Sequence, residues 1–301
     1  MKVTTIGAAL VDIYFESPDF QVKDKAGGQF LCQPYGHKVE IIDHEVTTGG
    51  SATNTAVAFA RRGHDVSIIA ELGHDNFASM IKNELIAEKV NTQYLVQEKQ
   101  EKTGCSVILR GGDGGRTVMV SRSASGMLDD YDIPVPYLTT RDWIHLGSVG
   151  GNLNALSEIW QVFELAKVGF SWNPGMSELK HLASGNLELP SVTKGAFIVN
   201  EQEWQVIEKL QKKILTDFTW VIVTAGKKGG NIYVGGEHYR EFTAKSDMPA
   251  FEETGAGDAF ASGLVSTIIY ERTIDEALQA ALNNSDSVIR HIGAKKGLLS
   301  F

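Results

Sequence analysis

Residues 252–260 combine glycines, a threonine and carboxylates in an order that suits chemistry on an anion. They lead directly into an apolar stretch that predicts a helix over 258–270. Backbone N–H groups at the start of a helix converge on one spot, and the helix dipole adds positive potential there. Asp258 is compatible with a helix cap or with a catalytic base in this position. Gly255 and Gly257 favour the base, because they let backbone approach a ligand more closely than capping requires.

Further polar residues stand where expected strands end and expected helices begin. Asn54 falls in the first turn of a helix expected over 51–62, directly after a double glycine that includes Gly50. Asp12 follows the first expected strand, and Glu203 lies in the first turn of a later helix, where the dipole favours a carboxylate. Each side chain is compatible with a local capping or turn role as well as with ligand binding.

These residues require a scaffold in which strands alternate with helices. Short β-branched or apolar runs predict buried strands, and apolar residues at helical spacing predict the helices between them. The expected strands are 3–6, 66–70, 143–146, 170–172, 196–199 and 219–224, with a hairpin at 231–234 and 238–242; the expected helices are 51–62, 77–89, 155–167, 201–213, 258–270 and 274–291. This alternation is typical of an α/β fold with a mostly parallel sheet covered by helices on both faces. We expect residues 1–301 to form one domain, since no low-complexity linker divides the chain.

Two segments do not follow that alternation. Residues 14–48 are polar and rich in turn formers, and residues 105–122 contain a glycine cluster at 111–115 that predicts a hairpin turn. Possible strands within the two segments are 29–32, 39–46, 106–109 and 117–121. We therefore expect a small β-sheet that stands off the main sheet.

Composition narrows the function classes. The chain has 301 residues and a net charge of −9, from 28 Lys and Arg against 37 Asp and Glu, which argues against a general nucleic-acid-binding protein. Apolar runs are too short for a membrane span, no signal-peptide pattern is present, and Cys32 and Cys105 are too few for a disulfide framework. We expect a soluble cytoplasmic protein with no membrane partner. The first strand is not followed by G-x-G-x-x-G, which argues against a dinucleotide-dependent oxidoreductase.

Taken in order, these motifs resemble those of the ribokinase-like (PfkB) family of carbohydrate and nucleoside kinases. Residues 254–258 are similar to the family's signature D-T-x-G-A-G-D, and residues 49–56 to its signature G-G-x-x-x-N-x-A. Shorter elements at 7–12, 73–75, 200–203 and 224–229 are similar as well. The resemblance covers nearly the whole chain. It implies a three-layer ribokinase-like fold in which the small β-sheet, segments 14–48 and 105–122, acts as a lid over the acceptor.

The resemblance also implies a role for each matching residue. Asp258 would be the general base for the acceptor hydroxyl, and the backbone of Gly255, Ala256 and Gly257 would stabilise the transferring γ-phosphoryl group of ATP. The other implied roles are acceptor binding by Asp12, Gly50 and Asn54; ATP binding by Asn200, Thr224, Gly226, Gly229 and Asn283; and organisation of Mg²⁺ by Glu203 with Asn200, through water and phosphate.

One position departs from the family pattern in a way that bears on cofactors. The family's signature opens with an aspartate three residues before its first glycine, where this chain has Glu252. In many members this region helps to bind a monovalent cation, so potassium activation is left open for this chain.

The identity of the acceptor is left open by the motifs. The lid aromatics would suit stacking on a nucleobase, but they also suit the lid's own core; they are Phe15, Phe20, Phe30 and Tyr35. The lid cations would suit binding of a phosphosugar, but they also suit an ordinary charged surface; they are Lys38, Arg110, Arg116 and Arg122. Because the cations form no tight cluster in the sequence, we expect an unphosphorylated sugar such as ribose or a ketohexose. A nucleoside kinase is the next alternative, then a phosphosugar kinase and, remotely, a non-catalytic sugar or nucleotide sensor. Exposed strand edges in the lid further predict a homodimer.

Overall fold

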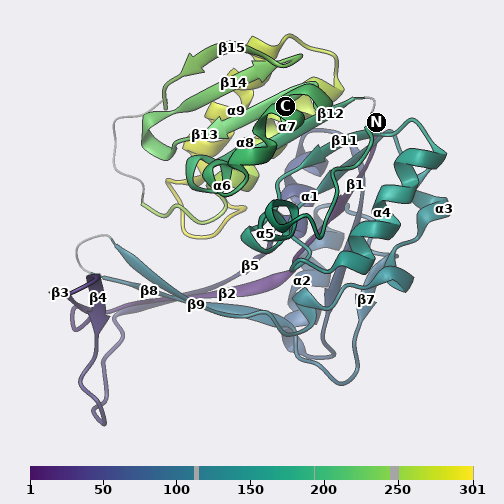
Figure 1. Ribbon diagram of the computed structural model, residues 1–301. Helices are drawn as coiled ribbons and strands as arrows, with labels where there is room; N and C mark the ends of the chain where they lie inside the picture. Colours follow the sequence, from purple (N-terminus) through teal and green to yellow (C-terminus); the bar gives the residue numbers. More distant parts are fainter. Residues whose placement is uncertain (112–114, 193, 245–250, 301) are drawn as a thin grey trace.

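The computed structural model describes residues 1–111, 115–192, 194–244 and 251–300, and a large sheet forms its centre (Figure 1). The strand order is β15-β14-β13-β12-β11-β10-β1-β6-β7. Pairing is parallel from β13 to β7 and antiparallel at β14 and β15. The bounds are β1 (Lys2–Ile6), β6 (Asp65–Leu72), β7 (Leu95–Gln97), β10 (Trp143–Leu146), β11 (Gly169–Trp172), β12 (Gly195–Asn200), β13 (Trp220–Thr224), β14 (Gly230–Val234) and β15 (Glu237–Phe242).

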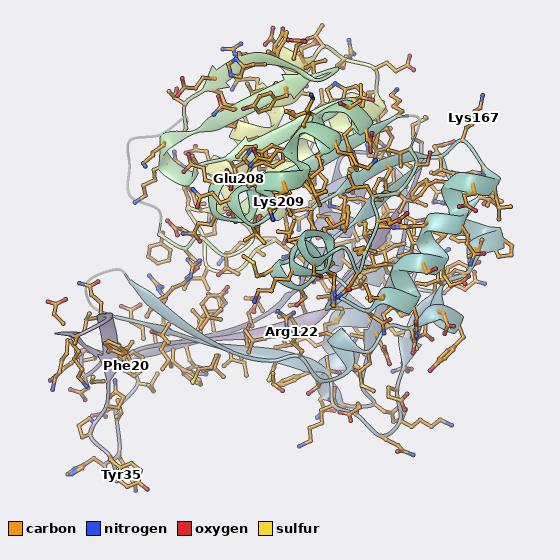
Figure 2. The ribbon with its side chains drawn as sticks, viewed as in Figure 1. Phe20, Tyr35, Arg122, Lys167, Glu208 and Lys209 are labelled. Atoms are coloured by element: carbon orange, nitrogen blue, oxygen red, sulfur yellow. The ribbon has the colours of Figure 1, made fainter. Side chains whose placement is uncertain are left out.

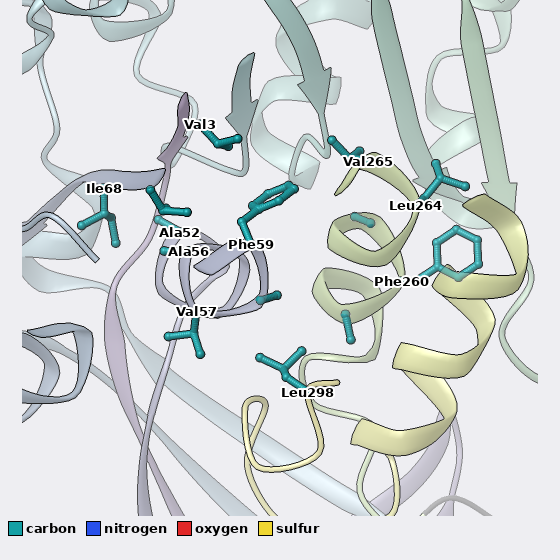
Figure 3. Close-up of a cluster of buried hydrophobic side chains, with 14 of the residues drawn as sticks. Val3, Ala52, Ala56, Val57, Phe59, Ile68, Phe260, Leu264, Val265 and Leu298 are labelled. Atoms are coloured by element: carbon teal, nitrogen blue, oxygen red, sulfur yellow. The ribbon is translucent and has the colours of Figure 1, made fainter. Parts of the chain in front are cut away.

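Helices cover both faces of this sheet, as the alternation predicts. Successive strand residues point to opposite faces, so Ile68 packs into one buried cluster and Ile69 into the other. The first cluster lies against α1 (Ser51–Arg61), α2 (Asn76–Ala87), α8 (Ala256–Ile269) and α9 (Ile274–Val288); the second lies against α3 (Val135–Leu138), α4 (Leu153–Leu165), α5 (Met176–Ser184), α6 (Glu201–Val206) and α7 (Gln211–Asp217). Figure 3 shows Phe59 of α1 and Phe260 of α8 within the first cluster. Over the described ranges, no helix combines the length and apolar character that crossing a membrane requires.

A small separate sheet projects from this body (Figure 1). Its strands are β5 (Asp43–Gly49), β2 (Leu10–Glu16), β8 (Gly104–Arg110) and β9 (Arg116–Ser121), in that order, and a hairpin of β3 (Gln21–Lys25) and β4 (Gly28–Cys32) lies at its far end. The expected pairing of strands on either side of the glycine cluster is confirmed, since β8 and β9 are antiparallel. Residues 112–114 of the expected turn lie outside the described residues. We call β2–β5, β8 and β9 the projecting sheet.

Some element boundaries differ from the expectations. The projecting sheet starts at Leu10 rather than at 14, because β2 pairs along its whole length with β5 and β8. The helix expected over 201–213 is divided into α6 and α7. Ile207, between them, has non-helical backbone angles and is buried in the core. Two short helices, each turning its own apolar side toward the sheet, replace one long amphipathic helix.

Several motif loops meet at one edge of the main sheet. Gly7 follows the carboxyl end of β1, and Asn200 and Thr224 are the last residues of β12 and β13 and pair directly in register. In parallel α/β sheets, ligands bind outside the carboxyl ends of the strands. The fold therefore brings motifs that are far apart in the sequence to the edge where a ligand site is expected.

Candidate active site

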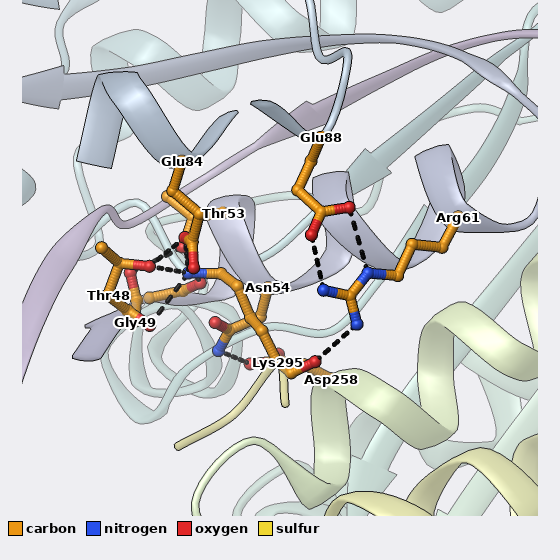
Figure 4. Close-up of polar contacts among 10 residues, drawn as sticks. Thr48, Gly49, Thr53, Asn54, Arg61, Glu84, Glu88, Asp258 and Lys295 are labelled. Atoms are coloured by element: carbon orange, nitrogen blue, oxygen red, sulfur yellow. Dashed lines mark hydrogen bonds and ion pairs between the residues drawn. The ribbon is translucent and has the colours of Figure 1, made fainter. Parts of the chain in front are cut away.

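Asp258 lies in the first turn of α8, where backbone geometry is set by a glycine. Gly255 is the residue that begins the helix, with φ of 80° in the left-handed region. A Cβ atom there would lie 2.3 Å from the Cβ of Ala294, so a larger residue would be strained and would clash. The Asp258 carboxylate does not cap the helix. Instead its Oδ2 accepts a 2.8 Å hydrogen bond from Nδ2 of Asn54 in α1 (Figure 4).

On balance, the surroundings of Asp258 raise the pKa of its carboxyl above the ordinary value. Burial raises the pKa of Asp258, and the negative charge of Asp12 raises it further. The hydrogen bond from Asn54 and the positive charge of Lys295 act in the opposite direction and lower this pKa. The carboxyl is thus poised between opposing influences, which is common for groups that exchange protons during catalysis.

Asp12 occupies the root of the projecting sheet and faces the same region. Its side chain is buried, and Oδ1 accepts a hydrogen bond from the hydroxyl of Ser106 on β8. Burial raises the pKa of Asp12, while the bond from Ser106 and the charge of Lys295 lower it. Gly50, which begins α1, has φ of 98°, and a Cβ atom there would lie 2.4 Å from the Ala8 carbonyl oxygen. Asp12, Gly50 and Asn54 are therefore brought together as the sequence predicts.

A cavity of about 320 Å³ adjoins the start of α8. The predicted residues Thr224, Gly226, Gly229, Ala256 and Gly257 all line it. Its other lining residues are the apolar Phe242, Phe260, Leu282 and Ile289 and the polar or charged Arg116, Lys227, Glu253, Ser285 and Asp286, together with Ala244. The cavity thus pairs an apolar wall with a glycine-rich loop and the amino end of a helix, which suits a flat apolar group attached to an anion.

Three of the residues predicted to bind ATP or Mg²⁺ do not line this cavity. Asn200 and Glu203 form two hydrogen bonds with each other. The side-chain Oδ1 of Asn200 accepts a bond from the backbone N–H of Glu203 at 2.9 Å, and the backbone N–H of Asn200 donates to Oε2 of Glu203 at 2.8 Å. Asn283 lies on α9 and accepts a 2.9 Å bond from Gln279, whereas its neighbour Leu282 lines the cavity. Within the part of the chain that the structure describes, no group of three or more His, Cys, Asp or Glu side chains is placed to hold a metal.

Lys295 is a site residue that the sequence analysis missed. It is buried, its Nζ donates to the Thr48 carbonyl at 2.9 Å, and it forms an ion pair with Glu84 at 3.0 Å (Figure 4). Its segment follows α9 and has no helical or strand periodicity to mark it. The available signal is the run of glycine, alanine and leucine around two lysines at 293–299, an unusual setting for charged residues.

The projecting sheet contacts the loop before α8 through two arginines. Nη1 of Arg116 on β9 lies 2.8 Å from Oε1 of the buried Glu252, which also accepts bonds from the amide and hydroxyl of Thr254. The guanidinium of Arg110 on β8 lies 4.3 Å from the ring centre of Phe251. This second missed contact connects the projecting sheet to the glycine loop at the start of α8.

Of the lid residues considered for acceptor recognition, Arg116 lines the cavity and Arg110 contacts Phe251, whereas several others lie away from the site. Tyr35 is fully exposed at the far end of the projecting sheet, and Phe20 lies buried within that sheet's own structure (Figure 2). Phe30 is on the β4 hairpin and 44% exposed. Lys38 and Arg122 are exposed, and neither of them lines the cavity that Arg116 lines.

Comparisons with known proteins agree with this arrangement. The pattern of the pfkB family of carbohydrate kinases matches residues 2–299. A fructokinase from Escherichia coli is 28% identical over 292 residues, covering 88% of this chain and 83% of the relative. The Burkholderia thailandensis nucleoside kinase, solved in complex with inosine, has a TM-score of 0.78 at 18% identity, covering 99% of this chain and 94% of that one. A Cryptococcus neoformans ribokinase in complex with ADP has a TM-score of 0.72 at 21% identity, covering 99% and 97%.

The predicted ribokinase-like α/β fold is confirmed by these structures, and the family match extends over the motifs that line the site. The chain therefore belongs to the pfkB family of carbohydrate kinases, phosphotransferases with an alcohol group as acceptor.

Proposed function

We propose that the protein transfers the γ-phosphoryl group of ATP to a hydroxyl of a small unphosphorylated sugar, of the ribose or ketohexose type, with Asp258 as general base. One observation carries this proposal. The Asp258 carboxylate lies at the amino end of α8, held by Asn54, while Ala256 and Gly257 of the same turn line the adjoining cavity. A base and an anion-binding backbone are thus placed side by side.

The chemistry follows from this placement. Asp258 takes the proton of the acceptor hydroxyl as that oxygen forms its bond to the γ-phosphorus, and the bond from the γ-phosphorus to its bridging oxygen breaks to release ADP. Because the pKa of Asp258 is raised, it lies closer to the pH at which the enzyme works, which suits a general base. The backbone of Gly255, Ala256 and Gly257, with the helix dipole, stabilises the charge on the transferring group.

Asn54 supports the assignment of the acceptor position. Its Oδ1 is buried, and within the described residues it has no hydrogen-bond partner, although its Nδ2 is bonded to Asp258. A buried acceptor without a partner is costly unless a ligand group satisfies it. We propose that acceptor hydroxyls bond Asn54 and Asp12, beside the backbone of Gly50.

We assign the 320 Å³ cavity to the nucleotide. Thr224, Gly226 and Gly229 would face its phosphates, and the apolar wall would contact its base. The ribokinase solved with ADP supports nucleotide use in this fold. Contacts from Asn200 and Asn283 to the nucleotide stay predictions.

For Mg²⁺, the residues present fit a weakly held ion. Glu203 contributes a single carboxylate beside Asn200, which suits an ion that keeps several waters and phosphate oxygens as ligands. Such an ion supplies neutralisation of the phosphate charge. For a monovalent cation the fit is poor, because the Glu252 carboxylate is already paired with Arg116. We therefore propose that potassium is not required.

We further propose that residues 1–301 act as one domain with segments 14–48 and 105–122 as its lid, which would exclude water from the acceptor. Val118 and Val120 on β9 are 45% and 52% exposed, and every residue of this edge strand is exposed. We propose that two protomers cover these edges in a homodimer. Light scattering at micromolar protein concentration tests this, and a monomer would contradict it. Use of ATP also favours a cytoplasmic location.

A nucleoside is the second candidate acceptor, because the nucleoside kinase solved with inosine has one of the most similar folds. The distant position of Tyr35 and the burial of Phe20 count against stacking by these aromatics.

An ADP-release assay distinguishes the candidates. The protein is incubated with ATP and Mg²⁺ and, in parallel, with fructose, ribose, inosine or fructose 6-phosphate. We expect release above the ATP-only blank with a free sugar. Release with inosine or the sugar phosphate would reassign the acceptor, and release with none of the acceptors would favour the non-catalytic sensor.

A further inference from the structure

Lys295 is a buried cation beside the proposed site to which the chemistry above gives no task. Its side chain is 5% exposed and points between two elements. Nζ bonds the carbonyl and hydroxyl of Thr48, the last but one residue of β5, and pairs with Glu84 of α2 (Figure 4). The Thr48 hydroxyl also contacts Oε2 of Glu84. The ammonium is therefore fixed at the root of the projecting sheet.

The main chain that carries this lysine is held as firmly as its side chain. Arg61 of α1 donates to the Lys295 carbonyl at 2.8 Å and to the Leu298 carbonyl at 3.3 Å. Glu88 pairs with the same guanidinium and keeps it in place (Figure 4). The Leu299 amide donates to Asn284 at 2.9 Å. The ammonium thus has little freedom to move away from the site.

The Lys295 ammonium interacts with carboxylates from three elements, of which Glu84 forms the ion pair. Asp12 from β2, Asp258 from α8 and Glu84 from α2 all interact electrostatically with Lys295. The polar and charged groups that face Asp258 are Asn54, Lys295 and Asp12, of which Lys295 carries the positive charge. The negative charge of Glu252 also raises the pKa of Asp12. Two nearby carboxylates in a poorly solvated place repel each other, and one of them takes up a proton unless a cation is close.

We propose that Lys295 is a positioning residue for phosphoryl transfer, whose fixed ammonium keeps Asp12 and Asp258 ionised side by side. Asp258 then enters the reaction cycle able to accept a proton, while Asp12 remains a hydrogen-bond acceptor for the sugar. This inference rests on the proposed role of Asp258 as base.

A double-mutant cycle tests the charge coupling without any substrate. Urea unfolding at pH 7.5 is measured for the wild type, Lys295→Met, Asp258→Asn and the double variant. We compare how far Asp258→Asn lowers the equilibrium constant for unfolding in each background. The decrease should be at least about fivefold larger in the Lys295→Met background than in the wild type. Equal effects in the two backgrounds would overturn the proposal.

Matched variants keep this cycle decisive. Lys296→Met removes the neighbouring lysine, which is exposed and 3.9 Å from Glu45, and should show no coupling to Asp258. Coupling of the same size would show that the effect is not specific to Lys295 and would contradict the proposal. If Lys295→Met does not fold, Lys295→Gln gives the same comparison, since its amide can donate to Thr48 without a charge.

The kinetic measurement separates positioning from a merely structural role. With ATP, Mg²⁺ and fructose, the acid limb of the kcat profile should move to higher pH by about half a unit or more in Lys295→Gln, and Lys295→Arg should restore it. A decrease in kcat by the same factor at every pH, with no shift of the acid limb, would contradict the proposal. Near-normal turnover by Asp258→Asn would instead overturn the base assignment, and the catalytic part of this inference with it, whereas equal effects in the unfolding cycle would overturn the Lys295 proposal alone.

Discussion

Asn54 and Asp258 are 204 positions apart in the sequence, yet the Asn54 amide donates a 2.8 Å hydrogen bond to the Asp258 carboxylate. The two helices that carry them pack through a shared cluster that includes Phe59 and Phe260 (Figure 3). The proposed base is therefore oriented by a residue of the acceptor motif, so that acceptor binding and proton transfer are linked by one contact.

Asn54→Ala removes this contact and also the buried acceptor Oδ1. We expect kcat/KM to fall by about 10–100-fold, the range for loss of a hydrogen bond to a charged group. The acid limb should also move to higher pH, because the bond from Asn54 lowers the pKa of Asp258. Steady-state kinetics across pH measure both effects. Asn186→Ala, at an exposed position, is the control. An unchanged kcat/KM would show that Asn54 has no part in the reaction.

Activity should not depend on potassium. Arg116 already supplies positive charge to Glu252 at 2.8 Å, so this carboxylate does not need a bound cation. Initial rates are compared in potassium chloride and in N-methyl-D-glucamine chloride at equal ionic strength. A rate ratio near one is expected. Activation by potassium of about tenfold, equivalent to about 1.4 kcal/mol of barrier, would contradict the Arg116 interpretation.

Glu71 should make stability fall as the pH rises. Burial, followed by the charges of Asp132, Glu98 and Asp129, raises the pKa of Glu71 from 4.5 to about 7. The folded state therefore holds a proton that the unfolded chain releases, and stability is lost as the pH rises through this window. Glu71→Gln should be more stable than the wild type by about 2 kcal/mol at pH 8 and similar to it near pH 4.5. Urea unfolding at the two pH values measures this, and a pH-independent difference would argue against it.

Glu178 should be needed for stability at the edge of the sheet that carries the site. Its fully buried carboxylate accepts bonds from the amides of Val149, Gly151 and Gly175 at 2.8–3.0 Å. Glu178→Ala leaves these amides without their acceptor and should lower the free energy of unfolding by about 3 kcal/mol. Glu164→Ala, at an exposed position of α4, should change it by less than about 0.5 kcal/mol. Comparable effects of the two variants would contradict this account.

The sequence predicts those parts of the site that depend on local structure. Asp258 and Asn54 lie in first helical turns that follow glycines, where helix starts leave recognisable patterns, whereas Asp12 lies inside strand β2 rather than in the turn that the sequence also allowed. The strand and helix alternation likewise predicts most of the main sheet, because most strands carry their own apolar run, but the three-residue strand β7 was not expected.

The rest depends on long-range contacts that no local pattern contains. Lys295 meets Thr48 across 247 positions, and Arg116 meets Glu252 across 136. These partners are chosen by the topology of the folded chain rather than by spacing. The split between α6 and α7 was missed for a related reason: the burial of Ile207 depends on how the two short helices pack on the sheet, which a single amphipathic pattern does not reveal.

The most direct test of the central claim is the turnover of Asp258→Asn in the ADP-release assay, with saturating ATP and the sugar that the wild type prefers, together with its ATP affinity by calorimetry. The account predicts a fall in kcat of about 10²–10⁴-fold, with ATP affinity and thermal stability retained. Near-wild-type turnover by this variant would contradict Asp258 as the base.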